Sequence, residues 1–260
     1  MCSKMVEIDD GILRKIDKEL QELRDRIGVD RKTLNEVFDK PTLLAFGKLI
    51  SNRIIEYVDF PISTGKEANI FRAVTPQNKF VVVKVYRIAT SNFNKMIYYI
   101  QGDPRFAAVA RSKREIVYQW VKKELKNLER LQEIGVPAPK PIRAWKNLLV
   151  MEYIGDDIAP APLLKNVKLN RARETYDTII ESIRRMYQDG EMVHSDLSEY
   201  NILYHNDIPY IIDLAQGVVI DHPMAMEFLR RDIRNIVTYF RRYGIKEDDE
   251  KIFNEIVKGN

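Results

Sequence analysis

Two polar side chains on one short stretch of the sequence have the types and spacing that phosphoryl transfer needs. Residues 194–203 read HSDLSEYNIL, so Asp196 and Asn201 lie five positions apart. A carboxylate can align an attacking hydroxyl and accept its proton, and an amide oxygen can hold Mg²⁺ against phosphate groups. The alternative is an ordinary Asx-rich turn between two strands. The stretch therefore predicts a catalytic loop with Asp196 as its carboxylate, and the turn is the competing interpretation.

A second acid follows at the end of a short apolar run. Residues 210–214 read YIIDL, and Asp213 comes twelve positions after Asn201. A charge there is costly unless it is paired or bound to a metal, so a helix cap or an ion pair is the alternative role. Asp196, Asn201 and Asp213 form a hard, oxygen-rich set that suits Mg²⁺ or Mn²⁺, with Asn201 and Asp213 as the predicted ligands. The histidines are isolated from one another in the sequence, which argues against zinc.

A lysine within a valine-rich run is the third feature that needs a chemical explanation. Residues 80–86 read FVVVKVY, and alternation along a strand places Lys84 on one face with Val82 and Tyr86. A lysine there needs an anionic partner, and phosphate oxygens together with a glutamate on a helix would serve. Glu124 is the glutamate that we choose, and a solvated helix face is its alternative role.

Upstream of this lysine, a polar turn joins two predicted strands. Residues 62–70 read ISTGKEANI, and Ser63 with the backbone N–H groups of the turn could surround phosphate. The turn has a single glycine, Gly65, and does not match the GxxxxGK[ST] phosphate loop. A nucleotide-binding loop and an ordinary hairpin turn are both compatible with this stretch.

Periodicity along the chain supplies the elements that must hold these groups. Apolar residues at helical spacing predict helices at about residues 8–27, 41–55, 112–134, 170–189 and 223–243. Extended runs predict strands at about residues 69–74, 80–86, 142–145 and 148–153, with two short strand pairs between residues 193 and 220. Residues 88–110 show no clear period and predict a long, partly mobile loop, where substrate recognition could lie.

The order of these elements predicts an α+β protein with two lobes. We expect an N-terminal helical extension over residues 1–55, a small β-rich lobe over residues 56–153 and a mostly helical lobe over residues 154–260.

Composition indicates the class of protein and the cellular compartment that suits it. The chain has 260 residues, a hydrophobic fraction of 45%, a net charge of +4 and a pI near 8.9, which describe a globular and mildly basic protein. One cysteine excludes an intramolecular disulfide and fits a reducing cytoplasm. The sequence shows neither a signal peptide nor an apolar run of membrane-spanning length. We expect a cytoplasmic protein that binds neither membranes nor DNA.

Basic clusters at residues 111–114 and 230–231 could contact RNA phosphates, with solvated helix faces as the alternative.

Taken in this order, the segments resemble a protein-kinase catalytic core. Lys84 lies where that family has its strand lysine, and Glu124 resembles the helix glutamate. Residues 151–154 resemble the hinge between the lobes, residues 194–201 the catalytic loop, and residues 213–215 the metal loop.

The departures from this pattern are similar to those of the RIO family of atypical serine kinases. The glycine-rich loop is STGKEAN, Ser195 replaces the arginine before the catalytic aspartate, and Asp213 is followed by Leu-Ala rather than Phe-Gly. The 47 residues after Asp213 contain no Ala-Pro-Glu segment, so we expect no peptide-docking helices. The family signatures, as they stand here, are STGKEAN, HSDLSEYNIL and IDLAQ. The resemblance covers about residues 45–243 and points to the subgroup without a winged-helix domain.

This resemblance implies a reduced protein-kinase fold that binds ATP with Mg²⁺ or Mn²⁺ between its lobes. Lys84, held by Glu124, would bond the α- and β-phosphates, and backbone groups of Glu152 and Ile154 would bond adenine. The implied nucleotide-binding residues are Ile62, Ser63, Gly65, Lys66, Glu67, Ala68, Ile70, Val82, Lys84, Glu124, Met151, Glu152, Ile154, Ser198, Leu203 and Ile212.

The resemblance also implies an activity and partners. It implies a serine/threonine protein kinase that autophosphorylates on serine and acts in maturation of the small ribosomal subunit, with the pre-ribosomal small subunit or its factors as partners; contact with rRNA is what the basic clusters above could add. In a second implied chemistry, Asp213 accepts the γ-phosphoryl group as an aspartyl-phosphate and the protein acts as an ATPase switch. The alternatives are a small-molecule phosphotransferase of the aminoglycoside-kinase type, which STGKEAN argues against, and a nucleotide-switched binding module for ribosome assembly.

Overall fold

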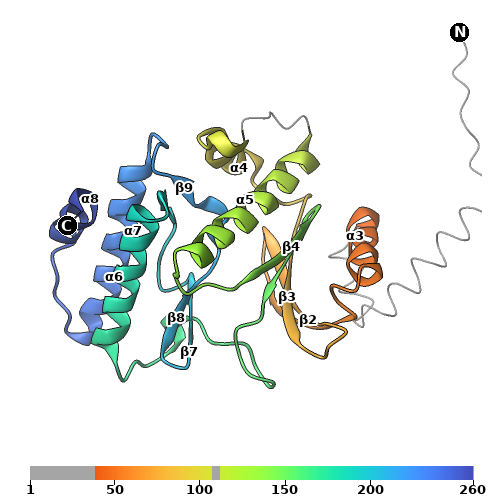
Figure 1. Cartoon of the computed structure of the whole chain (residues 1–260), viewed down its shortest axis with the longest axis horizontal. Coiled ribbons are helices and arrows are strands. Elements are labelled where there is room, and N and C mark those ends of the chain that lie inside the picture. The colour runs from red at the N-terminus through yellow and green to blue at the C-terminus, as the bar shows by residue number, and fades with distance from the viewer. Residues whose placement is uncertain (1–38, 107–111, 260) are drawn as a thin grey trace, which may run out of the picture.

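The computed structural model describes residues 39–106 and 112–259, which form a strand-rich part followed by a helical part (Figure 1). The helix predicted at residues 8–27 lies outside the described residues. The α+β arrangement of a sheet lobe and a helical lobe agrees with the expectation from the sequence.

One antiparallel sheet makes up most of the strand-rich part, in the strand order β1-β2-β3-β5-β4. Its strands are β1 (Tyr57–Thr64), β2 (Ala68–Val74), β3 (Phe80–Tyr86), β4 (Pro141–Trp145) and β5 (Leu148–Glu152). A short turn joins β2 to β3, so the predicted hairpin is confirmed. The register of β2 and β3 pairs Ile70 with Lys84, which brings the end of the polar turn close to the strand lysine.

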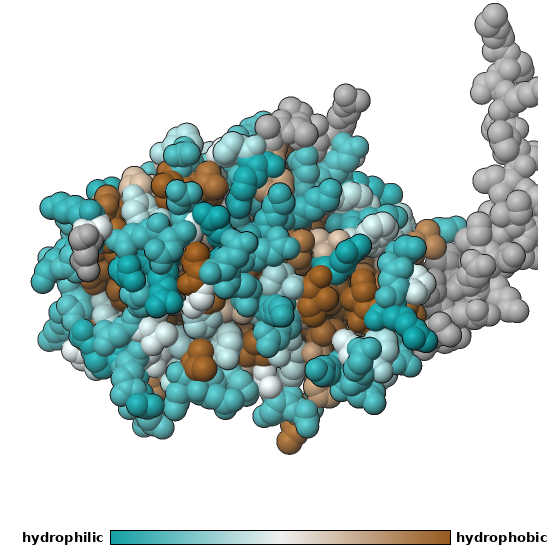
Figure 2. All heavy atoms as spheres, viewed as in Figure 1, coloured by the Kyte–Doolittle hydropathy of each residue, from teal (hydrophilic) through white to brown (hydrophobic). Residues whose placement is uncertain are grey.

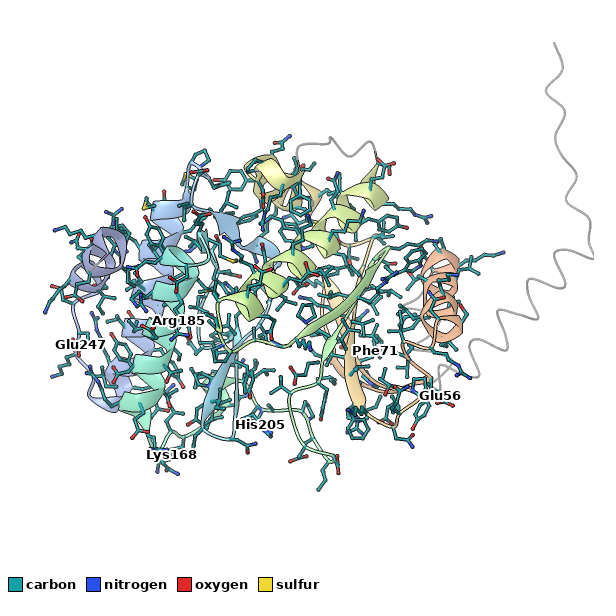
Figure 3. All side chains as sticks on the ribbon, viewed as in Figure 1. Glu56, Phe71, Lys168, Arg185, His205 and Glu247 are labelled. Atoms are coloured by element: carbon teal, nitrogen blue, oxygen red, sulfur yellow. The ribbon has the colours of Figure 1, made fainter. Side chains whose placement is uncertain are left out.

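The alternation predicted for β3 is confirmed by two separate apolar cores. Val81, Val83 and Val85 pack with helix α3 (Lys40–Ser51), and Phe71 of β2 lies on the same side (Figure 3). Val82 belongs to the other core, which continues through α5 (Lys113–Glu133) into the helical part. The sheet is therefore covered by a helix on each face, and Lys84 lies on the face toward α5.

Local signals explain where these two helices begin. The Asp39 carboxylate accepts a hydrogen bond from the N–H of Thr42 at 3.0 Å, and Pro41 lies in the first turn of α3. The Ser112 hydroxyl accepts a bond from the N–H of Glu115 at 3.3 Å at the start of α5. In α5 the buried apolar side chains alternate with charged ones at helical spacing, so the helix can pack on the sheet and still present Glu124 to it.

The loop predicted over residues 88–110 is wrong, because residues within it form a helix, α4 (Phe93–Gln101), and a single 3₁₀ turn, η1 (Pro104–Phe106). Asn92 caps α4 by accepting a bond from the N–H of Lys95 at 3.1 Å. Met96, Tyr99 and Ile100 follow a helical spacing and are buried. This apolar stripe is short and is embedded in polar and aromatic residues, so its period is hard to recognise in the sequence.

Three helices lie side by side at the left of Figure 1: α6 (Ala172–Gln188), α7 (Ala225–Phe240) and α8 (Asp249–Lys258). The first two agree with the predicted helices, whereas α8 was not among them. α8 is capped by Asp248 and buries Ile252, Phe253 and Ile256 against the rest of this part. The remaining 3₁₀ turns are η2 (Leu164–Asn166), η3 (Leu214–Gln216) and η4 (Arg241–Tyr243).

Two short antiparallel strand pairs lie between the sheet and these helices, as predicted. They are β6 (Met192–Val193) with β9 (Val218–Val219), and β7 (Ile202–His205) with β8 (Ile208–Ile211). The predicted catalytic loop runs from β6 to β7, and the predicted metal loop runs from β8 to β9. Both loops therefore start and end on paired strands.

The hydropathy of the described residues bears on whether one of their helices could span a membrane. Figure 2 shows hydrophilic side chains over most of one face, with apolar side chains in separate groups. Among residues 39–106 and 112–259, the helices lack the combination of length and apolar composition that crossing a bilayer requires.

Gly155 occupies a tight place in the connection from β5 to the helical part, and we predict that Gly155→Ala is destabilising. Its φ is 153°, and an added Cβ would lie 2.6 Å from the Ala159 carbonyl oxygen and 2.8 Å from Pro160 Cα. We expect the free energy of unfolding in guanidinium chloride to fall by about 2 to 3 kcal/mol. Gly244→Ala is the matched control, because Gly244 has a φ of 81° and nothing within 4 Å of its added Cβ. Strain alone predicts a loss of about 1 kcal/mol there, and equal losses at both positions would contradict the prediction.

Candidate active site

An ion cluster of Lys84, Glu124 and Asp213 joins β3, α5 and the segment after β8. Lys84 Nζ lies 2.7 Å from Glu124 Oε1 and 2.9 Å from Asp213 Oδ1. The side chains of Lys84 and Glu124 are 7% and 1% exposed, whereas that of Asp213 is 44% exposed. Two buried charges thus hold a third that faces solvent, where a substrate could reach it.

In this cluster, the attraction between opposite charges shifts each pKa in the direction opposite to the shift that burial causes. Burial on its own would lower the pKa of Lys84, but the carboxylates of Asp213 and Glu124 raise that pKa well above its ordinary value. The Lys84 ammonium lowers the pKa of Asp213. Burial raises the pKa of Glu124 despite the ammonium beside it, and the Tyr86 hydroxyl donates a hydrogen bond to Glu124 Oε2. At neutral pH a protonated Lys84 therefore faces an ionised Asp213.

The catalytic loop, residues 194–201, is hydrogen-bonded to a buried carboxylate on α7 that the sequence reasoning did not identify. Asp232 on α7 is 1% exposed, and its carboxylate accepts bonds from the N–H of Ser195 at 2.8 Å and of Leu197 at 2.9 Å. Arg231 donates to the Ser195 carbonyl. These bonds fix the backbone on both sides of Asp196. The signal in the sequence was an acid between Leu229 and Ile236, on the apolar face of a predicted helix.

Asp196 and Asn201 are linked within this loop and to the metal loop, which in the structure extends over residues 213–217. Asn201 Nδ2 donates to the Asp196 carbonyl at 2.7 Å, and Gln216 Nε2 donates to Asp196 Oδ2 at 3.0 Å. The N–H of Ile212 donates to the Asn201 carbonyl at 3.0 Å. The two loops are thus bonded to each other directly before Asp213.

The oxygen atoms at this junction fit Mg²⁺. Because Asn201 Nδ2 is used inside the loop, Oδ1 is the amide oxygen that remains for a ligand. Asp213 supplies a partly exposed carboxylate. The part of the chain that the structure describes contains no group of three or more His, Cys, Asp or Glu side chains that could hold a metal. Mg²⁺ commonly takes one or two protein oxygens and completes its shell with water and phosphate, so this small donor set suits it.

The other predicted nucleotide residues lie on the sheet, in the turn after β1, after β5 and in the catalytic and metal loops. Ile70, Val82 and Met151 lie on or against the core of the sheet face that carries Lys84. Leu203 and Ile212 are partly buried beside the catalytic and metal loops. The rest are placed as follows: Ile62 and Ser63 on β1, Gly65, Lys66 and Glu67 in the following turn, Ala68 on β2, Glu152 at the end of β5, Ile154 after it, and Ser198 in the catalytic loop.

Several of these residues make their hydrogen bonds away from the ion cluster. Lys66 lies in an exposed turn, where its carbonyl accepts a bond from the Thr90 hydroxyl at 2.5 Å. Ser198 accepts bonds from the N–H groups of Tyr200 and Asn201, so it shapes the catalytic loop. The N–H of Glu152 donates to the Lys140 carbonyl at 2.8 Å.

Arg72 is a second buried charged residue that the sequence reasoning missed. It lies on β2 two positions after Ile70, and its guanidinium carbon is 4.0 Å from the centre of the Phe80 ring. Its Nε bonds to Asp59 at 2.7 Å, and its NH1 donates to the Asp157 carbonyl at 2.8 Å. Arg72 thereby ties the sheet to the connection between the two parts of the molecule.

The histidines are separate from one another in space as well as in sequence. His194 is buried, which lowers its pKa, and its Nε2 lies 3.0 Å from the Ile212 carbonyl oxygen. His222 stacks on Phe228 at 5.8 Å between ring centres. His205 lies at the end of β7, toward the edge of the molecule (Figure 3). His194 thus supports the metal loop from inside.

A buried strand lysine that bridges a helix glutamate and a loop aspartate, above a second loop bearing an aspartate and an asparagine, defines a protein-kinase-like phosphotransferase fold. Comparison with known proteins then gives the family. Residues 69–252 match the RIO domain. The chain belongs to the family of RIO-type serine/threonine-protein kinases.

Its relatives cover most of the chain. It is 42% identical over 253 residues to the RIO-type serine/threonine-protein kinase Rio1 of Haloferax volcanii, covering 96% of this chain and 87% of that protein. It is 48% identical over 189 residues to Rio1 of Thermoplasma acidophilum, covering 73% and 99% respectively. The fold resembles the crystal structure of the Rio2 kinase–ADP/Mg²⁺–phosphoaspartate complex from Chaetomium thermophilum, with a TM-score of 0.65 and 23% identity over 84% of this chain and 67% of that one.

Asp232→Asn tests whether the buried carboxylate holds the catalytic loop. A carboxamide has one acceptor oxygen, so one of the two loop N–H groups should lose its partner, and we expect kcat to fall about tenfold. Burial raises the pKa of Asp232 to about 7, against the backbone bonds from Leu197 and Ser195. The folded state therefore binds a proton more tightly than the unfolded chain, which gives stability below about pH 4 that is lost as the pH rises toward about 7.

In Asp232→Asn, stability should no longer depend on protonation of residue 232, and denaturant unfolding can measure this. Relative to the wild type, the free energy of unfolding of Asp232→Asn should improve as the pH rises from about 4 to about 7. Asp249→Asn serves as the control, because the Arg234 hydrogen bond lowers the pKa of Asp249 and this group is already ionised in that interval. Parallel curves for the wild type and Asp232→Asn would show that Asp232 does not titrate as described.

Proposed function

We propose that this protein transfers the γ-phosphoryl group of ATP to a serine or threonine hydroxyl of a protein. The observation that carries the proposal is the ion cluster, in which a buried lysine is held between Glu124 and a partly exposed Asp213. Lys84 would bond nucleotide phosphates, and Mg²⁺ bound by Asn201 and Asp213 would neutralise phosphate charge. The apolar side chains of Ile70 and Val82 on the same sheet face would cover the adenine.

Asp196 is the group that would handle the acceptor. The acceptor oxygen forms a bond to the γ-phosphorus, the bond to the bridging oxygen of ADP breaks, and the acceptor proton passes to the Asp196 carboxylate. Asp196 is suited to this role because its backbone is fixed through Asp232 and one carboxylate oxygen accepts a bond from Gln216. Most of the rate gain would come from such positioning and from electrostatics.

A second chemistry at the same site has its own support. The Asp213 side chain is 44% exposed at the start of the metal loop, and the Rio2 relative was crystallised as a complex with ADP, Mg²⁺ and phosphoaspartate. In this reaction an Asp213 oxygen forms a bond to the γ-phosphorus and ADP leaves. Water then attacks the phosphorus, releasing phosphate and restoring the carboxylate, so the protein would act as an ATPase switch.

The biological setting stays a proposal that rests on the family. We propose association with the pre-ribosomal small subunit in the cytoplasm, tested by co-sedimentation of the protein with these particles. Of the two basic clusters expected to contact RNA phosphates, the one at residues 230–231 is engaged within the chain: Arg230 stacks on Phe253 at 3.9 Å, and Arg231 bonds the Ser195 carbonyl. Contact with rRNA is therefore better sought at the cluster at residues 111–114, where the Arg114 side chain is 50% exposed.

Asp196→Ala tests the kinase reaction. We incubate the protein with γ-labelled ATP and Mg²⁺, with and without a protein acceptor, and measure acid-stable label on serine. We expect turnover to fall by roughly 10² or more while nucleotide still binds. Glu255→Ala, on the outer side of α8 in an exposed ion pair with Lys251, is the control and should keep wild-type turnover. Undiminished turnover in Asp196→Ala would exclude its catalytic role.

The sensitivity of the label to hydroxylamine, combined with Asp213→Ala, distinguishes the two chemistries. If the aspartyl-phosphate forms, label on the wild type is released by hydroxylamine, free phosphate accumulates, and both signals disappear in the variant. Acid-stable serine label without hydroxylamine-labile label favours the kinase reaction alone. Phosphorylation of small hydroxylated acceptors in place of protein would support a small-molecule phosphotransferase. Absence of both label and phosphate release from the wild type would overturn the proposed function and favour a binding module.

A further inference from the structure

A buried polar cluster lies beside the metal loop and plays no part in the function described so far. It consists of Lys123 and Asn127 on α5, and of Asp103 and Arg105 in the segment that follows α4. Asp103, Lys123 and Asn127 have exposed fractions of 1%, 0% and 0%. Polar groups are costly in such a place unless all of them have partners. Where their bonds lead therefore indicates what the cluster does.

Asp103 is the anion that balances two cations in this cluster. Its carboxylate accepts bonds from Arg105 Nε at 2.9 Å and NH2 at 2.7 Å, and lies 3.5 Å from Lys123 Nζ. Burial would raise the pKa of Asp103, but the Arg105 hydrogen bonds and the Lys123 charge lower it overall. Burial lowers the pKa of Lys123 to about 8, and the Asp103 charge opposes that shift. Without Asp103, two cations would be left close together in the interior.

The cations and the amide of this cluster are directed at the metal loop. Asn127 Nδ2 donates to the carbonyls of Leu214 at 2.8 Å and Gly217 at 3.0 Å, and Lys123 Nζ also donates to the Gly217 carbonyl. Arg105 NH2 donates to Asn127 Oδ1 at 2.8 Å. Because Arg105 occupies the oxygen of this amide, the nitrogen must face the metal loop. The segment after α4 thus sets the orientation of a side chain on α5.

The turn that these side chains hold is central to the site. It begins directly after Asp213, which has a left-handed φ of 65°, and η3 forms its body. Gln216 in the same turn donates to Asp196 at 3.0 Å. A shift of the turn would therefore move both the carboxylate proposed to hold Mg²⁺ and a partner of the carboxylate proposed to handle the acceptor.

We propose that the buried polar cluster positions the metal loop, with Asp103 and Arg105 as positioning residues that act through Lys123 and Asn127. The inference rests on the proposed function, since it assigns these residues to the same phosphoryl transfer. The segment predicted to be a mobile loop thus has a structural role. It supplies Asp103, the counter-ion that allows Lys123 and Asn127 on α5 to hold the metal loop in place.

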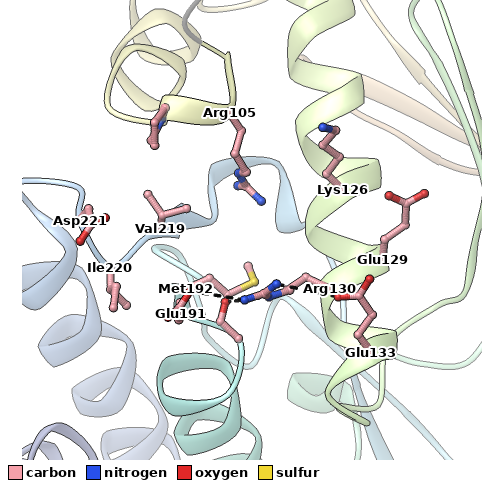
Figure 4. Close-up of a pocket in the computed structure, with 12 residues that line it drawn as sticks. Arg105, Lys126, Glu129, Arg130, Glu133, Glu191, Met192, Val219, Ile220 and Asp221 are labelled. Atoms are coloured by element: carbon pink, nitrogen blue, oxygen red, sulfur yellow. Dashed lines mark hydrogen bonds and ion pairs between the residues drawn. The ribbon is translucent and has the colours of Figure 1, made fainter.

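Arg105 offers a mild way to disturb the cluster. Its side chain is 28% exposed and borders a hollow of about 440 Å³ between α5 and the segment around β9 (Figure 4). Replacing it removes the bond that orients Asn127 without creating a closed cavity. Asp103→Asn is the stronger change, because it keeps the shape of the side chain and removes its charge.

The first test compares Arg105→Leu and Asp103→Asn with the wild type by amide hydrogen exchange and by steady-state kinetics. We expect faster exchange at residues 213–217 and unchanged exchange in α8. We also expect kcat to fall about tenfold, with KM for ATP changing by less than about threefold, because Lys84 and Glu124 remain paired. Glu133→Gln, an exposed change on the same helix and at the same hollow, should leave both measurements at wild-type values.

A double variant separates positioning from stability. Asp103→Asn combined with Lys123→Met removes the fully buried ammonium that Asp103 balanced and leaves only the partly exposed Arg105 without its carboxylate, so the midpoint of thermal unfolding should recover in part relative to Asp103→Asn alone. The bond from Lys123 to the Gly217 carbonyl is still absent, so kcat should stay low. Recovery of the midpoint with kcat still low supports the proposal, whereas recovery of both would reduce the cluster to a stability element and overturn it.

The two proposals fail in different ways. A wild-type protein without label transfer or phosphate release would overturn the proposed function, and hydrogen exchange at residues 213–217 would then decide the positioning role by itself. An active wild type whose metal loop exchanges at the same rate in both single variants would overturn the positioning role and leave the proposed function intact.

Discussion

Burial of the Lys84 ammonium between two carboxylates is the interaction on which the arrangement of the site depends. A lysine that is 7% exposed is tolerated because Glu124 and Asp213 lie within 3 Å of it and oppose the cost of desolvation. Each partner comes from a different element, one from the helix on the sheet and one from the loop below. The need to pair one charge therefore brings the sheet, α5 and the metal loop to a common point.

The same physical solution recurs at two further places around the site. Asp232 is buried beneath the catalytic loop and holds it by two backbone N–H groups. Asp103 is buried beside the metal loop and balances Lys123 and Arg105, which reach that loop directly or through Asn127. Each acid is costly to bury alone and stabilising with its partners. The loops that carry the catalytic groups are thus fixed by buried charges in addition to the apolar contacts of Leu197 and Leu214.

Much of the fold could be predicted from local patterns because periodicity is a local property. The valine-rich strand around Lys84 is buried on both faces and α5 buries an apolar stripe, and the structure has both elements close to the predicted bounds. The pattern failed at α4, where three buried residues among aromatic and polar neighbours gave too weak a period. It also left out α8, a helix of 10 residues. Asp232 and Arg72 were missed because their partners lie far away in the sequence.

By itself, the sequence determined the residue types of the site, the order of the elements that bear them, and the resemblance to RIO kinases, since motif spacing and periodicity need no knowledge of distant contacts. The tertiary structure decided which charges meet. It placed Asp213 beside Lys84, 129 positions away, set Asp232 under the catalytic loop, and made a predicted loop into a helix that leads to Asp103. The reason is that a buried charge is stable only with a partner within a few ångströms, and such partners are chosen by packing across the whole chain.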